Sequence, residues 1–176
     1  MKILIILSAV AVGVSGSPAA EPFFQASLAP DIAINSKTAQ IDGICLSIWG
    51  ENPQRAFALG FVNGSTGDSV GFTLGLVNYA ENYTGVAWGL VNISHKKFVG
   101  WQSGAVCYSE GYFKGFQTGW INVSQEFHGL QWGLVNYAEN LRGVQIGFVN
   151  VARNNPWFKE FPDKLAAGFP IVNWSF

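Results

Sequence analysis

Charge is scarce in this chain. Asp, Glu, Lys and Arg make up 12% of its 176 residues, and the formal net charge is −1, whereas an ordinary soluble domain carries about twice that charged share. A net charge so close to zero gives no long-range attraction to nucleic acid or to an anionic membrane surface. Methionine occurs once, at the first position, and cysteine twice. Glycine (21 residues) and aromatic residues (15%) are abundant instead, a mixture that favours strands and tight turns over helices.

The most informative feature that is present is an internal period. The stretch Asn78–Asn82 returns as Cys107–Gly111 and as Asn136–Asn140, at steps of 29 residues. Every step holds two similar halves, so the basic unit has 14 or 15 residues and the pattern Gly-x-x-x-Gly-x-(Val/Ile)-Asn. Clear copies begin at Gly71, Gly85, Gly100, Gly115, Gly129 and Gly143, and weaker copies begin at Ala56 and Gly43. Such a period predicts a tandem repeat architecture.

The N-terminus predicts a secretory signal. A short positive region, Met1-Lys2, precedes the apolar run Ile3–Val14 and the small residues of Ser15–Ala20. The apolar run is short for a helix that spans a bilayer. We therefore expect export, with a signal peptide at 1–20 and a single β-repeat domain at 21–176, which holds a repeat array at 41–152 and a closing strand at 167–176.

Each unit alternates with period two, which is the signature of a strand. In the unit that begins at Gly129, one face carries Leu130, Trp132 and Leu134. The other face carries Gly129, Gln131, Gly133, Val135 and Tyr137. Nearly all the charge lies in the short segments between units, for example 94–98, and these segments are predicted to be turns between neighbouring strands.

Two arrangements of the strands give the 29-residue period. Tyr follows the Asn position only in alternate units (Tyr79, Tyr108 and Tyr137). An up-and-down meander produces this alternation because the strand direction reverses each time, and the three tyrosines would then share one rim. A parallel solenoid with two strands in each 29-residue coil also produces it.

Two observations favour a membrane barrel over the solenoid. The strand segments of the six clear units contain no charged residue on either face. A soluble solenoid usually carries charge on its outer face, whereas a transmembrane barrel need not, because one face meets lipid and the other fills a narrow interior. The chain ends with Val172, Trp174 and Phe176 on one strand face, which resembles the C-terminal assembly signal of bacterial outer-membrane barrels. The predicted fold class is therefore all-β, an up-and-down antiparallel meander of about ten strands that closes into a small barrel. The alternative is a β-solenoid with 29-residue coils. Strands of eight or nine residues are slightly short for a bilayer.

The mature chain also resembles a group of uncharacterised exported bacterial proteins with surface repeats of the GLQxGLVN type. The resemblance rests on the repeat cores Gly129–Asn136 and Gly143–Asn150, on Phe24–Pro30 near the start, and on Phe169–Phe176 at the end. It implies export and a β-rich repeat array, without a specific activity. Cys107 departs from the pattern because it replaces the Asn of its unit.

The cysteines and the repeated polar residues have structural interpretations. Cys107 occupies an Asn position and Cys45 a position usually filled by Gln, several strands away and on the opposite strand face, so the register disfavours a disulfide, and the redox state of both thiols stays open. We interpret the recurrent Asn as a side-chain amide that bonds backbone where a strand ends, at Asn63, Asn78, Asn92, Asn122, Asn136 and Asn150.

The glutamine positions Gln102, Gln117, Gln131 and Gln145 form the candidate functional surface. In a barrel they line a narrow, uncharged lumen that conducts ions poorly. In a solenoid the Gly-Gln-Gly face is a flat binding surface for a glycan or a partner protein, and Trp88, Trp101, Trp120 and Trp132 on the other face are core.

The sequence predicts no catalytic residue, no cofactor and no metal site. It has no Gly-x-Ser-x-Gly motif, and His95 and His128 lie in predicted turns with only Glu126 as a nearby acid. We expect a non-enzymatic β-repeat protein of the bacterial outer membrane or cell surface with a structural or surface-interaction role. Its expected partners are membrane lipid and the outer-membrane assembly machinery, and nucleic acid is not among them. The alternative is a secreted or periplasmic module that binds a glycan or a protein.

Overall fold

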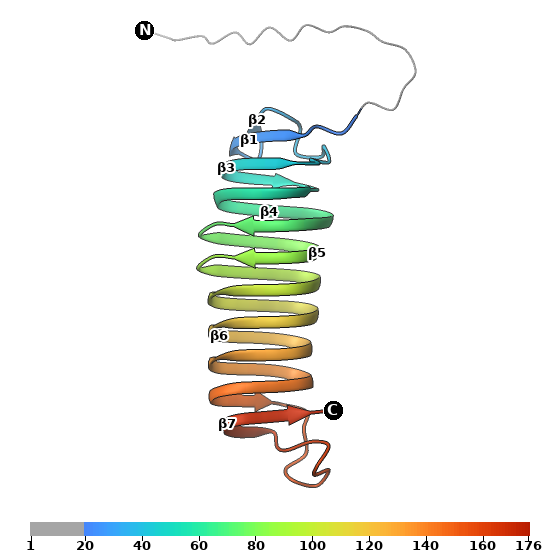
Figure 1. The fold of residues 1–176 in the computed structure, drawn as a ribbon, viewed down its shortest axis with the longest axis vertical. Coiled ribbons are helices and arrows are strands. Elements are labelled where there is room, and N and C mark those ends of the chain that lie inside the picture. The colour runs from blue at the N-terminus through green and yellow to red at the C-terminus, as the bar shows by residue number, and fades with distance from the viewer. Residues whose placement is uncertain (1–19) are drawn as a thin grey trace, which may run out of the picture.

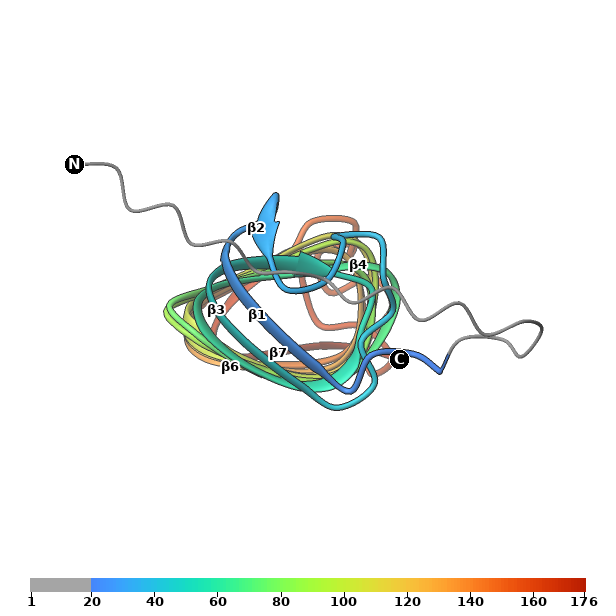
Figure 2. The same ribbon diagram turned by 90° about the horizontal axis from the view of Figure 1, so that it is seen from above.

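The fold is a rod of stacked coils. The computed structural model describes residues 20–176, so the predicted signal peptide lies outside the described residues apart from Ala20. Figure 1 shows the coils stacked along the rod from β1 to β7, and Figure 2, viewed from above, shows that successive coils superpose on one closed outline. The strands are β1 (Phe24–Ala29), β2 (Ile32–Ala33), β3 (Ile44–Asn52), β4 (Arg55–Leu74), β5 (Val77–Trp88), β6 (Val91–Ala152) and β7 (Gly168–Ser175).

The coils pair in parallel, with equivalent residues of successive units side by side. Asn63 of β4 pairs with Asn78 of β5, and Asn78 pairs with Asn92 of β6. These pairs are 14 or 15 residues apart in the sequence, so each repeat unit forms one complete coil. All strands belong to one sheet in the order β2-β1-β3-β4-β5-β6-β7. The structure is therefore a β-solenoid, as the alternative predicted.

This pairing corrects three predictions. The antiparallel meander that closes into a barrel is wrong, because the repeat units pair in parallel and β1 pairs with β2 and β3 rather than with β7. The coil length of 29 residues is also wrong, since that period spans two coils. The segments read as turns continue the strands, with Ser94 paired to Ala80 and Lys97 paired to Asn82.

The first glycine of each unit is required by the backbone. The six glycines of this column have φ between +137° and +144°, a region that residues with a Cβ atom rarely adopt. A Cβ atom on Gly115 would lie 2.0 Å from the carbonyl oxygen of Gly100 in the coil above. The chain bends here while the coils remain close together, and only glycine permits both. These glycines are Gly71, Gly85, Gly100, Gly115, Gly129 and Gly143.

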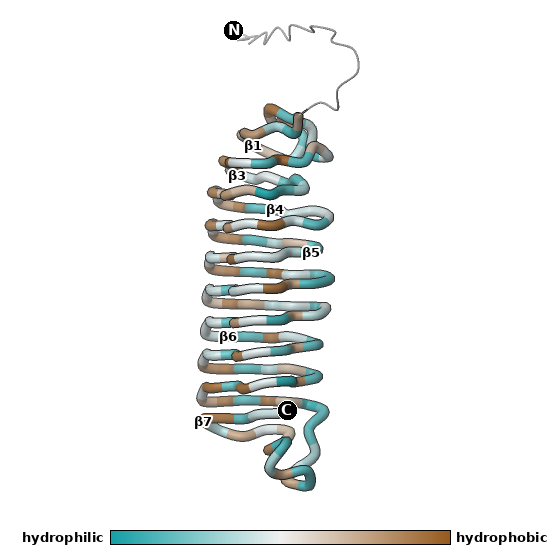
Figure 3. Tube along the Cα trace, turned by 45° about the vertical axis from the view of Figure 1, so that its right-hand side comes forward, coloured by the Kyte–Doolittle hydropathy of each residue, from teal (hydrophilic) through white to brown (hydrophobic). Residues whose placement is uncertain are grey.

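The interior is narrow and is filled by columns of identical or similar residues. One column stacks the rings of Tyr83, Phe98, Phe113 and Phe127, with centroids 5.1 to 5.4 Å apart, and Leu141 extends it. The other inward columns hold Asn, Gln, and small residues such as Ser94 and Ala138. Most other bulky apolar residues lie outside, and Figure 3 shows brown, hydrophobic residues recurring in coil after coil along the rod while teal residues gather along one edge.

Both ends of the rod are covered. At the N-terminal end β2 pairs antiparallel with β1, and Ile41 is fully buried beneath the last turns before β3. At the C-terminal end β7 pairs antiparallel with the last coil of β6, matching Gly143 with Ser175 and Val144 with Trp174. The segment 153–167 forms a loop over this end (Figure 1), and it buries Leu165 and Ala166. No helix capable of crossing a membrane occurs between residues 20 and 176.

Candidate interaction surface

The glutamine column forms a hydrogen-bonded ladder inside the rod. The Nε2 atom of each Gln donates to the Oε1 atom of the Gln one coil earlier, at 3.1 Å from Gln117, 2.8 Å from Gln131 and 2.8 Å from Gln145. These side chains are at most 1% exposed. The expectation that they form an accessible binding face is therefore wrong: they are interior groups whose hydrogen bonds are made to one another, as burial of an amide requires.

The asparagine column forms a second ladder, which runs in the opposite direction. Each Nδ2 atom donates to the Oδ1 atom of the Asn one coil later, for example at 2.9 Å from Asn78 to Asn92 and at 2.8 Å from Asn136 to Asn150. The same Nδ2 atom also donates to a backbone carbonyl, such as that of Trp88 for Asn78 and that of Ile146 for Asn136. The predicted bond from the Asn amide to backbone is confirmed, but its predicted place at the end of a strand is wrong, since Asn122 and Asn136 lie within β6. The sequence did not predict the inter-coil bond.

Cys107 interrupts this ladder. Its Sγ atom lies 3.8 Å from Nδ2 of Asn92 and 3.5 Å from the carbonyl oxygen of Thr118. A thiol has no amide N–H to offer the following coil, and Oδ1 of Asn122 has no hydrogen-bond partner. Cys45 and Cys107 are both free and buried, and burial raises the pKa of Cys45 to about 11 and that of Cys107 to about 12. Both cysteines point into the rod, so the prediction of opposite faces is wrong.

The outer surface presents an apolar face that runs the length of the array. It consists of the second, fourth and sixth residues of each unit, which alternate outward along one strand of every coil. We call these columns together the apolar face, and its columns are Ile44, Phe57, Phe72, Val86, Trp101, Phe116, Leu130 and Val144; Leu46, Leu59, Leu74, Trp88, Ser103, Thr118, Trp132 and Ile146; and Ile48, Phe61, Leu76, Leu90, Ala105, Trp120, Leu134 and Phe148.

The tryptophans belong to this face and not to the core. Trp120 is 68% exposed and Trp132 is 61% exposed, so the expectation that a solenoid would bury them is wrong. The inward positions of the same strand segment are occupied by the glutamine column instead. Phe148 is exposed as well, at 76%. An exposed apolar surface of this extent marks an interaction site in soluble and surface proteins.

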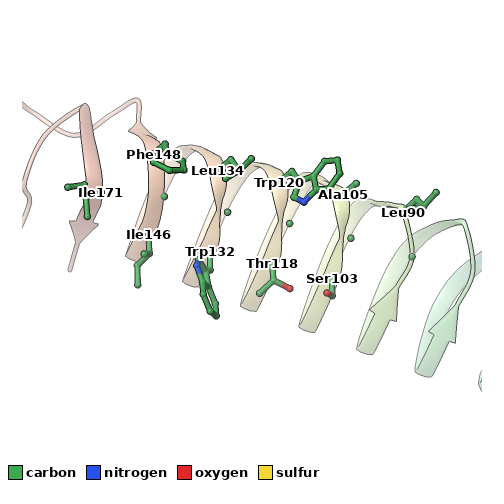
Figure 4. A pocket seen from close by; sticks show the side chains of 15 residues that line it. Leu90, Ser103, Ala105, Thr118, Trp120, Trp132, Leu134, Ile146, Phe148 and Ile171 are labelled. Atoms are coloured by element: carbon green, nitrogen blue, oxygen red, sulfur yellow. The ribbon is translucent and has the colours of Figure 1, made fainter.

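A groove runs along the apolar face, parallel to the rod axis. Its floor is the backbone of the fifth-position glycines, including Gly104, Gly119 and Gly133. Its walls are the fourth and sixth columns, which Figure 4 shows on opposite sides of the glycines, with Ile171 of β7 at the C-terminal end. The groove has a volume of about 760 Å³. The smallest side chains that line it are those of Ser103, Ala105 and Thr118. The groove was not predicted, although the absence of charge from these positions was its signal in the sequence.

A second groove continues the same line on earlier coils. It has a volume of about 520 Å³ and is lined by residues of β3, β4 and the turn before β5, among them Leu59, Phe61 and Leu76. The two grooves lie between the same two columns of the repeat. The apolar surface is therefore a property of the whole array and not of one coil.

The two borders of the apolar face differ in character. Along one border lies the column of residues that directly precede the first residue of each unit. In this column Arg55, Lys114 and Arg142 are exposed and His128 is half-buried, and one acidic residue, Asp42, lies next to Arg55 in the first coil. The other residues of this column are Val70, Thr84 and Val99. On the opposite border, past the seventh-position residues, lies the column of Glu51, Gly64, Tyr79, Ile93, Tyr108, Val123, Tyr137 and Val151. Tyr79 pairs with Ile93, so the three tyrosines share one column of alternate coils and not one end of a meander.

Three acidic residues, Glu81, Glu110 and Glu139, lie on the edge away from the apolar face and pair there with bases. Glu81 binds Lys96 at 3.2 Å, Glu110 binds His95 at 2.8 Å, and Glu139 binds Arg153 at 3.3 Å. Each pair joins two successive coils. The bond to Lys96 and the backbone N–H of Gly67 lower the pKa of Glu81. Exposed pairs of this kind contribute little to stability.

The predicted C-terminal assembly signal occupies the outer side of β7. Val172 pairs with Ile146 and Trp174 with Val144. The indole nitrogen of Trp174 donates to the carbonyl oxygen of Pro162 at 2.8 Å, and its ring lies 6.4 Å from that of Phe161. Phe176 follows the strand and is exposed. These residues fix the terminal loop to the last coil, and their role in assembly stays a prediction.

Comparisons with known protein families, with curated proteins and with solved structures found no match. Function is therefore inferred from the apolar face alone. Within residues 20–176 no group of three or more His, Cys, Asp or Glu side chains is placed to hold a metal ion. His95 is bonded to Glu110, and Nδ1 of His128 lies 3.4 Å from the hydroxyl of Tyr112, so both histidines take part in contacts between coils.

Proposed function

We propose that the protein is a non-enzymatic interaction module of the bacterial outer membrane or cell surface, and that it acts through the apolar face. One observation carries this proposal: three adjacent columns of the repeat are apolar from β3 to the end of β6, and no charged residue interrupts them. A surface of this kind costs solubility in every coil, so a partner that covers it is the simplest reason for its presence. The N-terminal signal pattern supports export.

A charged substitution in the middle of the face tests the proposal. Leu134 is 47% exposed, so Leu134→Glu places a carboxylate in the groove without opening a cavity. In a bacterial host that exports the chain, we expect the natural protein to stay with the cell envelope and Leu134→Glu to be released into the soluble fraction. Asn140→Glu, on the charged edge of the same coil, is the matched control and should stay with the envelope. Equal retention of Leu134→Glu would overturn the proposal.

A secreted or periplasmic module for a glycan is the second candidate. In the fourth column Ser103 and Thr118 lie between the indoles of Trp88 and Trp132, and indoles beside hydroxyl groups suit stacking on a sugar ring. The Thr118 hydroxyl is already engaged, since it accepts from the Trp101 indole at 3.1 Å and lies 3.4 Å from the Gln102 carbonyl oxygen. Few polar groups therefore remain to bond a sugar. If the glycan module is nevertheless correct, the protein should be recovered entirely in the soluble fraction.

A further inference from the structure

The apolar face offers almost no hydrogen-bonding groups. Of the side chains in its three columns, only Ser103, Thr118 and the indoles of Trp88, Trp101, Trp120 and Trp132 carry a polar atom. The Thr118 hydroxyl and the Trp101 indole already bond to each other. A protein–protein interface normally makes about one hydrogen bond for every 100–200 Å². A partner that requires no hydrogen bonds at all fits this face better than another protein does.

The backbone beneath the face is compatible with an environment that lacks water. Each strand of the face pairs with the coil before it and the coil after it, for example Phe72 with Val86 and Val86 with Trp101. Backbone groups that meet hydrocarbon must be bonded within the protein, because lipid cannot bond them. An in-register parallel stack meets this requirement along its whole length, and the antiparallel β7 extends it at the last coil.

The borders of the face complement a lipid headgroup layer. Three basic side chains on one border form no salt bridge within residues 20–176, namely Arg55, Lys114 and Arg142. Each is separated by one glycine or alanine from the second-position residue of its unit, which belongs to the apolar face. Long basic side chains at such a position place their stems along apolar surface and their charge at the headgroups. Tyrosine, which lies in the column beyond the opposite border, is a residue enriched at membrane–water interfaces. The net charge of −1 conceals this separation, because Glu81, Glu110 and Glu139 lie on the far edge and pair there with other basic residues.

We propose that the apolar face docks on the surface of a lipid bilayer, so that the rod lies flat with its groove on the acyl chains and its basic column at the headgroups. This inference rests on the proposed function and names the partner of the same face. The rod does not span the bilayer. It binds as an interfacial amphipathic element does, by burial of apolar area and by attraction to anionic lipid.

Binding of the purified mature chain to vesicles tests this. One set of vesicles is zwitterionic phosphatidylcholine, and the other contains phosphatidylcholine with anionic phosphatidylglycerol. We expect the protein to sediment with both, more tightly with the anionic set, and a blue shift of tryptophan emission as the exposed indoles of Trp120 and Trp132 leave water. Leu134→Glu and Trp120→Glu should each abolish binding to both sets, and their unfolding transitions should match that of the natural chain because both positions are exposed.

A matched pair of double variants tests the basic border. Lys114→Glu/Arg142→Glu reverses two charges beside the face, whereas Lys96→Glu/Arg153→Glu reverses two on the far edge, so the change in net charge is the same. Near an anionic surface one basic residue is worth about a fivefold change in affinity. For Lys114→Glu/Arg142→Glu we expect the ratio of the affinities for anionic and zwitterionic vesicles to fall by at least about fivefold for each residue changed. For Lys96→Glu/Arg153→Glu we expect this ratio to stay as in the natural chain. Equal losses would overturn the role of the border.

The remaining outcomes separate this inference from the proposed function. If the natural chain binds neither vesicle set while Leu134→Glu is still released from the envelope, the lipid inference is wrong and a protein partner takes its place. If the natural chain binds no vesicles and forms a dimer that Leu134→Glu abolishes in analytical ultracentrifugation, a second copy covers the face. If Leu134→Glu changes neither envelope retention nor vesicle binding, the proposed function itself fails.

Discussion

Asn92 and Cys107 meet inside the rod with 3.8 Å between Nδ2 and Sγ, at the point where other coils of the ladder place an amide oxygen. The consequence appears one coil later, where Oδ1 of Asn122 has no partner. The ladder is therefore two separate segments, Asn63 to Asn92 and Asn122 to Asn150, because the sulfur contacts Asn92 and the Thr118 carbonyl but makes no hydrogen bond with Asn122. The array tolerates the break because the glutamine ladder and the aromatic column continue past it.

Cys107→Asn should stabilise the protein. The new amide would accept from Asn92 and donate to the Thr118 carbonyl and to Asn122, as the other asparagines of the column do. Satisfying a buried acceptor and adding hydrogen bonds is worth about 1–2 kcal/mol in the free energy of unfolding. Urea unfolding followed by circular dichroism measures this, with Cys107→Ala as the control that removes the thiol without supplying an amide. A lower unfolding midpoint for Cys107→Asn than for the natural chain would contradict the ladder.

The Cys107 thiol should be unreactive in the folded protein. Burial raises its pKa to about 12 from an ordinary value of 9.0, and a thiol reacts as the thiolate. A chromogenic disulfide reagent at pH 8 should therefore label Cys107 only at the rate at which the rod opens. Because the unfolded thiol ionises at lower pH than the folded one, this group's contribution to stability is complete below about pH 9 and declines as the pH rises toward 12. Fast labelling without urea would refute the buried position.

Gln117→Met should destabilise the rod more than Gln145→Met. The Gln117 amide donates to Gln102 and accepts from Gln131 and Ser124, so a methionine of similar size leaves partners unpaired on both sides. We expect a loss of at least about 2 kcal/mol in the free energy of unfolding. Gln145 is the last member of the ladder, and its Oε1 atom already has no partner, so less is lost there. A loss at Gln145 that equals or exceeds the loss at Gln117 would contradict the direction of the ladder.

Gly115→Ala should be far more damaging than Gly67→Ala. Both glycines have positive φ, but a Cβ atom at Gly115 would lie 2.0 Å from a carbonyl oxygen, whereas at Gly67 the nearest atom is 4.0 Å away. The alanine at position 67 costs about 1 kcal/mol, since only the backbone conformation is unfavourable. At position 115 backbone strain and the clash add, and we expect at least about 3 kcal/mol. Thermal unfolding of the two variants gives this comparison, and equal shifts in Tm would argue against close stacking at the bend.

The sequence predicted strands, repeats and the Asn interaction, but it did not predict how the strands pair. Alternation along Leu130 to Leu134 is the same for a strand in a meander and for a strand in a coil, so it defines faces without defining neighbours. The decisive difference lies in the segments between units. Ser94 and Lys97 belong to a strand in the structure. These segments are polar because one side of the coil is more exposed to water, and in the sequence such polarity cannot be distinguished from that of a turn.

The burial of the glutamines and the exposure of the tryptophans, opposite to the prediction for a solenoid, have a physical cause. Gln131 and Trp132 are neighbours in the sequence, and hydrophobicity alone would bury the indole and expose the amide. In this rod the reverse holds, because identical amides stacked one coil apart satisfy one another at 2.8 Å. The cost of burying polar groups vanishes only when the register is exact, and no single unit of sequence reveals that register.

The covered ends of the rod determine how far its stacking extends. Parallel, in-register strands with ladders of Asn and Gln are also the arrangement that lets cross-β fibrils grow by adding chain after chain. Here the last coil would offer the same template, and the antiparallel β7 and the loop 153–167 occupy it. The chain thus confines a fibril-like geometry to one molecule of fixed length, and removal of its terminal strand would turn a finished particle into a seed for polymerisation.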